Sequence, residues 1–286
     1  MALTPPVVLT IAGFDPSSGA GITADIKTIA AHECYGVSCI TAITVQSTQG
    51  VRRVEPVEPQ TILETLRELV ADIEVAAVHL GMLGTSEAVQ VVADFLAKEK
   101  LPHIVLDPIL KSSSGAELLD PAGTRLLIER LIPLAEVVTP NLDEASALTQ
   151  LPVSNLGEMR AAAARLHSLG AANVVVTGGH LEKAIDLLSF TTGRGVEREV
   201  FKSDRLRSNS THGTGCAFST ALACHLAHGR GLPEAVLLSK AYVAAAITNA
   251  LPLGRGVGPV NHLYRMNRMR RASTAAPEVE AAHSRN

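Results

Sequence analysis

Short apolar segments alternate along this chain with longer segments in which apolar residues recur every three or four positions. The short segments are rich in β-branched residues and bounded by Gly, Pro or Asn, which predicts strands at 7–11, 37–45, 76–80, 103–106, 136–139 and 173–177. The longer segments predict helices at 20–31, 61–73, 86–98, 122–131 and 156–169. Several strands are apolar almost throughout, as in sheets that helices cover on both faces. The alternation therefore predicts an α/β fold with a mostly parallel central sheet.

The pattern changes after Gly178. Residues 185–191 and 196–201 flank a Thr-Gly-Arg-Gly turn and predict a late antiparallel hairpin at one edge of the sheet. Two Ala-rich apolar segments, 214–227 and 233–250, predict helices. Because no linker or repeat interrupts the pattern, we expect a single domain over residues 1–265. The basic and polar tail, 266–286, is expected to be disordered.

Composition narrows the classes of function. The 286 residues are 47% apolar, and 25 Lys plus Arg against 28 Asp plus Glu give a net charge of −3. Without a global positive field, and with only 3% aromatic residues, we expect no nucleic-acid partner. We also expect no membrane partner, because no stretch approaches 18 uninterrupted apolar residues and no signal peptide is recognisable. The four cysteines (Cys34, Cys39, Cys216 and Cys224) include no CxxC pair, which favours a reduced, cytoplasmic protein.

The strongest local signal is the segment Thr211-His212-Gly213-Thr214-Gly215-Cys216-Ala217, which runs directly into an apolar helix. Two glycines allow consecutive N–H groups to converge, and the helix adds the positive end of its dipole, so the segment suits a phosphate. A helix N-terminus also lowers a thiol pKa, so Cys216 is a candidate base. An ordinary glycine-rich turn is the competing interpretation.

Two further loops follow predicted strands. Gly13-Phe14-Asp15-Pro16-Ser17-Ser18-Gly19-Ala20-Gly21 matches no dinucleotide or Walker A spacing. It suits close approach of a small flat ligand, or a tight turn capped by Asp15 or Ser17. In Thr139-Pro140-Asn141-Leu142-Asp143-Glu144, the Asn141 and Glu144 side chains can share one face and hold hydrated Mg²⁺. The spacing alone favours a helix cap, and both roles can coexist.

Three smaller candidates carry weaker signals. Gln46 ends an apolar strand, where its amide can read the edge of a heterocycle, although a strand-end polar residue is commoner. Asp107 follows the 103–106 strand and can orient a hydroxyl, help bind a cation or cap a turn. His225 and His228 lie three apart on a predicted helix, and we expect an ordinary wet helix face rather than a metal site.

Six segments in this order together resemble one family. They are Thr10-Ile11-Ala12-Gly13-Phe14-Asp15-Pro16-Ser17, Gly19-Ala20-Gly21-Ile22 with Ala24-Asp25-Ile26-Lys27-Thr28, Gly81-Met82-Leu83, Thr139-Pro140-Asn141 with Glu144, Gly178-Gly179-His180, and His212-Gly213-Thr214-Gly215-Cys216. Over roughly Val7 to Tyr264 the chain resembles the hydroxymethylpyrimidine/phosphomethylpyrimidine kinases of thiamine biosynthesis, which belong to the ribokinase-like superfamily.

The resemblance implies a three-layer α/β/α fold and a kinase that uses ATP and Mg²⁺, and it leaves the use of a monovalent cation open. The substrates would be 4-amino-5-hydroxymethyl-2-methylpyrimidine and then its monophosphate. Matching motifs would place Gln46, Ala20, Gly13, Asp15, Met82, Asp107 and Ile109 around the substrate. They would place Asn141, Thr177, Gly179, Thr211 and His212 with the nucleotide, and Asn141 with Glu144 at hydrated Mg²⁺. Gly213, Thr214 and Gly215 would form the anion hole, and Cys216 would be the base.

Two positions depart from the family pattern. Thr177 stands where members commonly carry Lys before Gly-Gly-His, and Lys111 lies two positions earlier than the usual Lys after the Asp107-Pro108 step. Lys111 either replaces the missing charge or lies on the surface. A pyridoxal or pyridoxine kinase and a non-catalytic pyrimidine-sensing module are the alternative functions. The family tends toward dimers, so we expect a homodimer, with strand 37–45 a candidate for the interface.

Overall fold

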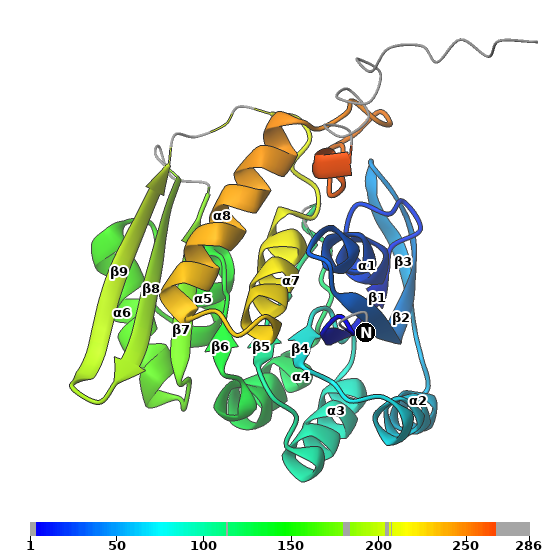
Figure 1. Ribbon diagram of the computed structural model, residues 1–286, viewed down its shortest axis with the longest axis horizontal. Helices are drawn as coiled ribbons and strands as arrows, with labels where there is room; N and C mark the ends of the chain where they lie inside the picture. Colours follow the sequence, from blue (N-terminus) through cyan, green and yellow to red (C-terminus); the bar gives the residue numbers. More distant parts are fainter. Residues whose placement is uncertain (1–3, 113, 180–183, 204–205, 207, 267–286) are drawn as a thin grey trace, which may run out of the picture.

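The computed structural model describes residues 4–112, 114–179, 184–203, 206 and 208–266. Within this part of the chain nine strands form one sheet in the order β3-β2-β1-β4-β5-β6-β7-β8-β9 (Figure 1). The strands are β1 (Val7–Phe14), β2 (Tyr35–Ser47), β3 (Gly50–Pro56), β4 (Ala77–Leu80), β5 (Ile104–Leu106), β6 (Val137–Val138), β7 (Asn173–Gly178), β8 (Ala184–Thr192) and β9 (Gly195–Ser203).

The centre of the sheet, from β2 to β7, is parallel. The predicted late hairpin is confirmed, since β8 and β9 pair antiparallel at one edge. The other edge is also antiparallel, because β3 folds back on β2, and the sequence pattern did not predict this strand. Arg52, Arg53 and Glu55 make β3 polar, so it carries no apolar alternation.

The helices are α1 (Gly21–Ala31), α2 (Pro59–Asp72), α3 (Ser86–Glu99), α4 (Pro121–Leu126), α5 (Leu142–Thr149), α6 (Leu156–Ser168), α7 (Thr214–Ala227) and α8 (Leu232–Thr248). The predicted helix over 122–131 is α-helical only to Leu126 and continues as a π turn, Leu127–Leu131, and a 3-10 turn, Ile132–Leu134. Pro133 offers no N–H to extend a regular helix.

Two separate cores hold helices against the two faces of the sheet. One core joins Leu9, Ile11 and Leu80 of the sheet to α2, α3, α5 and α6 through residues such as Ile62, Leu96 and Ala163. The other packs Ile29 of α1, Phe218 and Leu222 of α7 and Val236 of α8 against the opposite face. Figure 1 shows α7 and α8 in front of the sheet and α6 behind it. The three-layer α/β/α architecture is therefore confirmed.

Backbone hydrogen bonds show that the carboxyl ends of the central strands meet along one edge of the sheet. The N–H groups of Gly81, Asp107 and Thr139, which follow β4, β5 and β6, donate to carbonyls of the neighbouring strand: Ile11 within β1, and Leu80 and Leu106 at the ends of β4 and β5. The turn after β1 and the start of α7 meet at the same edge, since Gly213 lies against the carbonyl of Gly19. This edge is the usual place for ligands in an open α/β sheet.

Parts of the sequence-based predictions lie outside the described residues. They are His180 of the Gly-Gly-His segment and, apart from Met266, the basic tail of 266–286. In the described part of the chain, no helix is both long enough and apolar enough to cross a membrane.

Candidate active site

The turn after β1 is organised by the carboxylate of Asp15. Its Oδ1 accepts hydrogen bonds from the backbone N–H and hydroxyl of Ser17, at 2.8 and 2.7 Å. Its Oδ2 accepts from the N–H groups of Ala20, at 3.0 Å, and Gly19, at 3.3 Å. Burial raises the pKa of Asp15, but hydrogen bonds from His212 and Ser17 outweigh it and leave the pKa below its ordinary value. The capped tight turn weighed from the sequence is thus present.

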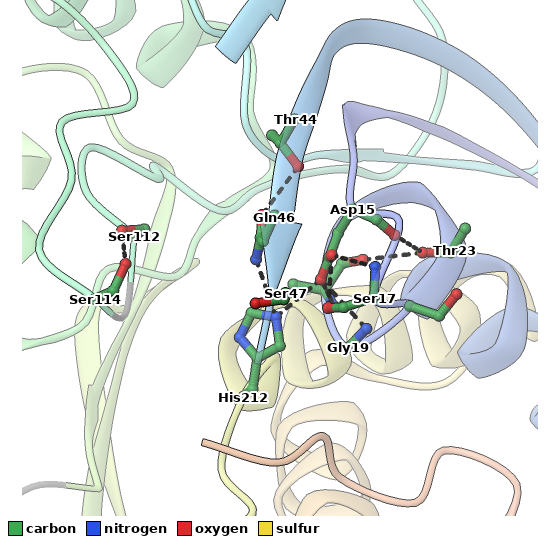
Figure 2. A network of polar contacts seen from close by, with 12 residues as sticks. Asp15, Ser17, Gly19, Thr23, Thr44, Gln46, Ser47, Ser112, Ser114 and His212 are labelled. Carbon is green, nitrogen blue, oxygen red and sulfur yellow. Dashed lines mark hydrogen bonds and ion pairs between the residues drawn. The ribbon is translucent and has the colours of Figure 1, made fainter. Parts of the chain in front are cut away.

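Asp15 and Gln46 converge on one histidine, as Figure 2 shows. Nε2 of His212 lies 2.8 Å from Oδ2 of Asp15 and 3.2 Å from the amide nitrogen of Gln46. Thr44 donates to the amide oxygen of Gln46 at 3.0 Å, so the amide is held at both ends. The structure therefore places His212 with two residues of the predicted substrate group, whereas the sequence comparison had grouped it with the nucleotide.

A cavity of about 140 Å³ opens beside this cluster. It is lined by Gln46, Ser47, Thr48, Gln49, Gly50, Ser112, Ser114, His212, Gly256 and Val257. Thr48 joins the β2–β3 turn to the segment at Gly256 and Val257. Its carbonyl accepts a hydrogen bond from the N–H of Val257, and its hydroxyl accepts one from the N–H of Gly256. Cys216 does not line this cavity.

The apolar residues predicted around the substrate ring also come together. Met82 and Ile109 pack in one small cluster with Ala42, Leu118 and Val54. Gly13 lies against this cluster, since a Cβ there would come within 2.9 Å of the Met82 sulfur.

The start of α7 presents backbone donors. Gly213 caps the helix with φ +80°, a conformation that favours glycine, and a Cβ there would overlap the carbonyl oxygen of Gly19. Within the described part of the chain, the N–H groups of Gly215 and Cys216 have no hydrogen-bond acceptor. Gly215 is exposed, and helix N-termini of this kind bind anions.

The structure corrects the prediction for the Cys216 thiol. Cys216 is buried and receives a hydrogen bond from the N–H of Gly21. Burial, followed by the carboxylates of Asp107, Asp25 and Glu144, raises the pKa of the thiol well above its ordinary value. The predicted lowering by the helix dipole is therefore wrong for the protein without ligand, because these effects exceed it.

Asp107 lies beside the same loop. Its Oδ2 would be 3.7 Å from a Cβ on Gly215, and it accepts a hydrogen bond from Ser219 at 3.2 Å. Burial raises the pKa of the Asp107 carboxyl to about 6, against the lowering effects of His79 and Ser219. A carboxylate with this pKa can accept a proton at neutral pH.

Asn141 and Glu144 form a complete capping box at the start of α5. The side chain of Asn141 accepts from the N–H of Glu144, and the Glu144 carboxylate accepts from the N–H of Asn141, both at 2.9 Å. Burial, then the nearby Asp107, raises the pKa of Glu144 well above its ordinary value. Two buried acidic groups close together fit a cation, which would relieve their repulsion. No cluster of three or more His, Cys, Asp or Glu side chains suited to a metal exists among the described residues.

Of the other predicted nucleotide residues, Thr177 and Gly179 lie at the end of β7, and Thr211 lies in the segment before α7. Thr177 is half-buried in β7 and bridges to Asn141, while Gly179 and Thr211 are exposed. Lys111 is exposed and pairs by a backbone bridge with Glu117, so it lies on the surface.

The prediction for His225 and His228 is half wrong. His228 is exposed as expected, but His225 is buried, with its ring 4.9 Å from that of His32. Sequence reasoning also missed His79 and Asp25 as a buried polar pair. The available signal was a histidine inside the apolar strand segment 76–80.

Comparison with known proteins shows which family this chain resembles. The family model for phosphomethylpyrimidine kinase matches residues 15–261. A hydroxymethylpyrimidine/phosphomethylpyrimidine kinase of Streptomyces coelicolor is 42% identical, covering 91% of this chain and 95% of that protein. The thiamine biosynthesis bifunctional protein ThiED of Geobacter sulfurreducens is 44% identical over 90% of this chain, which spans about half (52%) of that relative.

Solved structures of related kinases have the same fold as this chain. Pyridoxal kinase of Bacillus subtilis in its ADP complex superposes with a TM-score of 0.83 at 36% identity, covering 92% of this chain and all of that one. Phosphomethylpyrimidine kinase of Clostridium difficile superposes with a TM-score of 0.75 at 37% identity, covering 85% and 99%. The fold is that of the ribokinase-like vitamin kinases. The chain belongs to the phosphomethylpyrimidine kinase family and is a phosphotransferase.

Proposed function

We propose that this chain transfers a phosphoryl group from ATP to 4-amino-5-hydroxymethyl-2-methylpyrimidine and then to the resulting monophosphate. The observation that carries the proposal is the pair of N–H groups at Gly215 and Cys216 that find no acceptor among the described residues, at the same edge of the sheet as the Gln46 amide. Phosphoryl transfer needs donors where charge develops, and a pyrimidine alcohol needs polar groups that match its ring edge.

The substrate side would be built from Gln46 and the apolar cluster of Met82 and Ile109. An amide offers both a donor and an acceptor, which matches a ring nitrogen beside an amino group. Because the Gln46 amide lies against His212 in this structure, substrate binding would exchange that contact for the pyrimidine edge. Gly13, Asp15 and Ala20 would form the floor through the tight turn described above.

Two groups beside Gly215 are candidates to receive the proton of the substrate hydroxyl. Cys216 is the base that the family resemblance implies, and its protonated thiol would have to lose its proton to act. Asp107 is the second candidate, because a carboxyl with a pKa of about 6 is ionised at neutral pH. Gly213, Thr214 and Gly215 would hold the transferring phosphoryl group.

Asn141 and Glu144 would hold Mg²⁺ through water, and Asn141, Thr177, Gly179 and Thr211 would surround the nucleotide. Mg²⁺, when bound, neutralises charge on the ATP phosphates. Solved relatives include a pyridoxal kinase of Staphylococcus aureus in complex with an ATP analogue, AMP-PCP, which supports use of ATP.

We further propose a cytoplasmic homodimer. All four cysteines are free, which suits a reducing compartment. On β2, Ile43 and Val45 are 50% and 45% exposed, which supports the part of the predicted interface strand that faces outward. Sedimentation of the full chain measures the oligomeric state.

The deciding experiment follows ADP formation while ³¹P NMR follows the alcohol to its mono- and diphosphate. We expect both products, with a higher kcat/KM for the pyrimidine alcohol than for pyridoxal or pyridoxine. A preference for pyridoxal would favour the alternative kinase. Binding of the alcohol in calorimetry without ADP formation would favour a non-catalytic sensor.

A further inference from the structure

A fully buried polar chain lies directly beneath the candidate phosphate loop. His79 of β4 contacts Thr10 of β1 at 3.2 Å and Asp25 of α1 at 3.4 Å through Nδ1. Its Nε2 lies 2.9 Å from the hydroxyl of Ser219 on α7. Ser219 in turn reaches Oδ2 of Asp107 at 3.2 Å. All five side chains are almost completely excluded from solvent.

The protonation state of His79 follows from counting hydrogens on one side of the ring. The single hydroxyl proton of Thr10 is directed to Oδ2 of Asp25, at 2.7 Å. The Thr10 oxygen can therefore only accept from Nδ1 of His79. Nδ1 carries a hydrogen.

The same count applies to the other ring nitrogen. The Ser219 hydroxyl lies within hydrogen-bond distance of Asp107 Oδ2 and of the carbonyls of Gly215 and Cys216, all of which can only accept. When its single proton is donated to one of these three acceptors, its oxygen accepts from Nε2 of His79. In that arrangement both ring nitrogens carry hydrogen, and the ring is an imidazolium.

The charges that face His79 agree with this assignment. Asp25 lies against one side and Asp107 acts from the other, and together they raise the pKa of His79 against the lowering effect of burial. Thr220 donates to the second oxygen of Asp25 at 2.9 Å, which fixes that carboxylate between α1 and α7.

We propose that His79 is a positioning residue for phosphoryl transfer: as a buried imidazolium it holds Ser219 and, through it, the Asp107 carboxylate beside the Gly213–Gly215 loop. Its positive charge offsets Asp25 and Asp107, which would otherwise oppose the arrival of a phosphate. The inference rests on the proposed function, since it takes that loop as the phosphoryl site.

The charge is tested without substrate. In the full chain labelled with ¹⁵N-histidine, the His79 signals are assigned by their loss in His79→Gln. We expect both ring nitrogens to be protonated at pH 7 to 8. A ring with only one protonated nitrogen would overturn the proposal. If instead the imidazolium is found but the wild type forms no ADP with the pyrimidine, the proposed function fails while the charge assignment stands.

The positioning role is tested by kinetics. We expect His79→Gln to lower kcat roughly tenfold with little change in either KM, as for supporting hydrogen-bond partners elsewhere. His79→Lys keeps the charge and should recover most of kcat. His167→Gln is the matched control, since His167 makes a similar 2.9 Å bond to Ser189 away from the site. Equal damage in the Gln and Lys variants, with both folded, would contradict a role for the charge.

A second variant, Ser219→Ala, tests the proposal even if the His79→Gln protein does not fold. Ser219→Ala removes the link to Asp107 and leaves the imidazolium in place. We expect kcat to fall while the ¹⁵N spectrum keeps both protonated ring nitrogens. Wild-type kcat in a folded Ser219→Ala protein would remove Ser219 from the proposal.

Discussion

Nε2 of His212 and Oδ2 of Asp15 lie 2.8 Å apart, although 197 positions separate the two residues in sequence. This contact joins the turn after β1 to the segment before α7. It also brings the His212 ring against Gln46, so that one histidine links the proposed phosphate loop to the proposed pyrimidine contact. With the roles proposed above, this histidine would connect substrate recognition to phosphate binding.

Gln46→Ala should raise the KM for the pyrimidine alcohol far more than the KM for ATP. The variant loses the amide that would read the ring edge, and one such hydrogen-bonding group is worth about 1 kcal/mol or more. Initial rates at varied concentrations of each substrate measure the split. Gln60→Ala, on the exposed surface of α2, is the control. Equal changes in the two KM values would remove the role assigned to Gln46.

Gly213→Ala should lower kcat by about a hundredfold, as the loss of an oxyanion donor does elsewhere. An Ala side chain there would overlap the Gly19 carbonyl and displace the loop. Gly229→Ala is a matched control, because Gly229 has a similar φ of +76° but open space around its Cα. Both variants suffer the backbone strain, of about 1 kcal/mol, but only the first should lose activity. Similar kcat values in the two would show that the loop tolerates a side chain.

Cys216→Ala should fold and bind ligands yet lose most of its turnover, if the sulfur is the base. The pH dependence of kcat distinguishes the two candidate acceptors. With Asp107 as acceptor, kcat rises as pH passes about 6, where this carboxyl ionises. With Cys216 as acceptor, kcat should keep rising into alkaline pH, because the pKa of its thiol is raised. Wild-type kcat in Cys216→Ala would exclude the thiol, and Asp107→Asn then tests the carboxylate.

Glu144→Gln should retain the helix cap but raise the Mg²⁺ concentration needed for half-maximal activity. Gln can still accept from the N–H of Asn141, so the melting temperature should change little. The control is Glu158→Gln at the corresponding position of α6, where the N-cap Asn155 accepts from Glu158 in the same way. An unchanged Mg²⁺ requirement in Glu144→Gln would confine Glu144 to capping.

Three buried histidines should contribute less to stability as the pH is lowered from about 6.5 toward 4. Burial lowers the pKa of His32, His225 and His262 to about 4, so between these pH values the three rings bind more protons in the unfolded chain than in the folded one. Their contribution to the free energy of unfolding therefore rises with pH across this window, whereas the raised pKa values of Asp107 and Glu144 act in the opposite direction. Urea denaturation at pH 5 and pH 7 measures the difference, and His225→Phe should reduce it. The same difference between pH 5 and pH 7 in the wild type and in a folded His225→Phe protein would contradict burial of a neutral His225 ring.

The alternation of apolar segments was sufficient to predict the layers and the late hairpin, because buried parallel strands are apolar on both faces. Strand β3 was not predicted, because it is an edge strand with charged side chains and needs β2 as a partner. The capping box at Asn141 could be predicted from the sequence because its contacts span three positions. The contact between His79 and Asp25 could not be predicted, because it joins residues 54 positions apart through the packing of α1 on the sheet.

The raised pKa of Cys216 was equally beyond local reasoning. The position at a helix start was read correctly, and its local effect alone would favour a thiolate. Burial reverses this effect, followed by carboxylates that come from the end of β5, α1 and α5. Only the folded chain brings them together.

The burial of α7 has a consequence for the exchange of substrate and product. From Cys216 to Leu226 this helix is buried among α1, α8 and the sheet, so the core holds the body of the helix directly behind its exposed first residues. The β2–β3 turn, by contrast, is tied across the cavity by two backbone donors to Thr48, the N–H groups of Val257 and Gly256. If the cavity is the substrate site proposed above, substrate and product should therefore enter and leave by the opening of this turn, while the body of α7 stays in place.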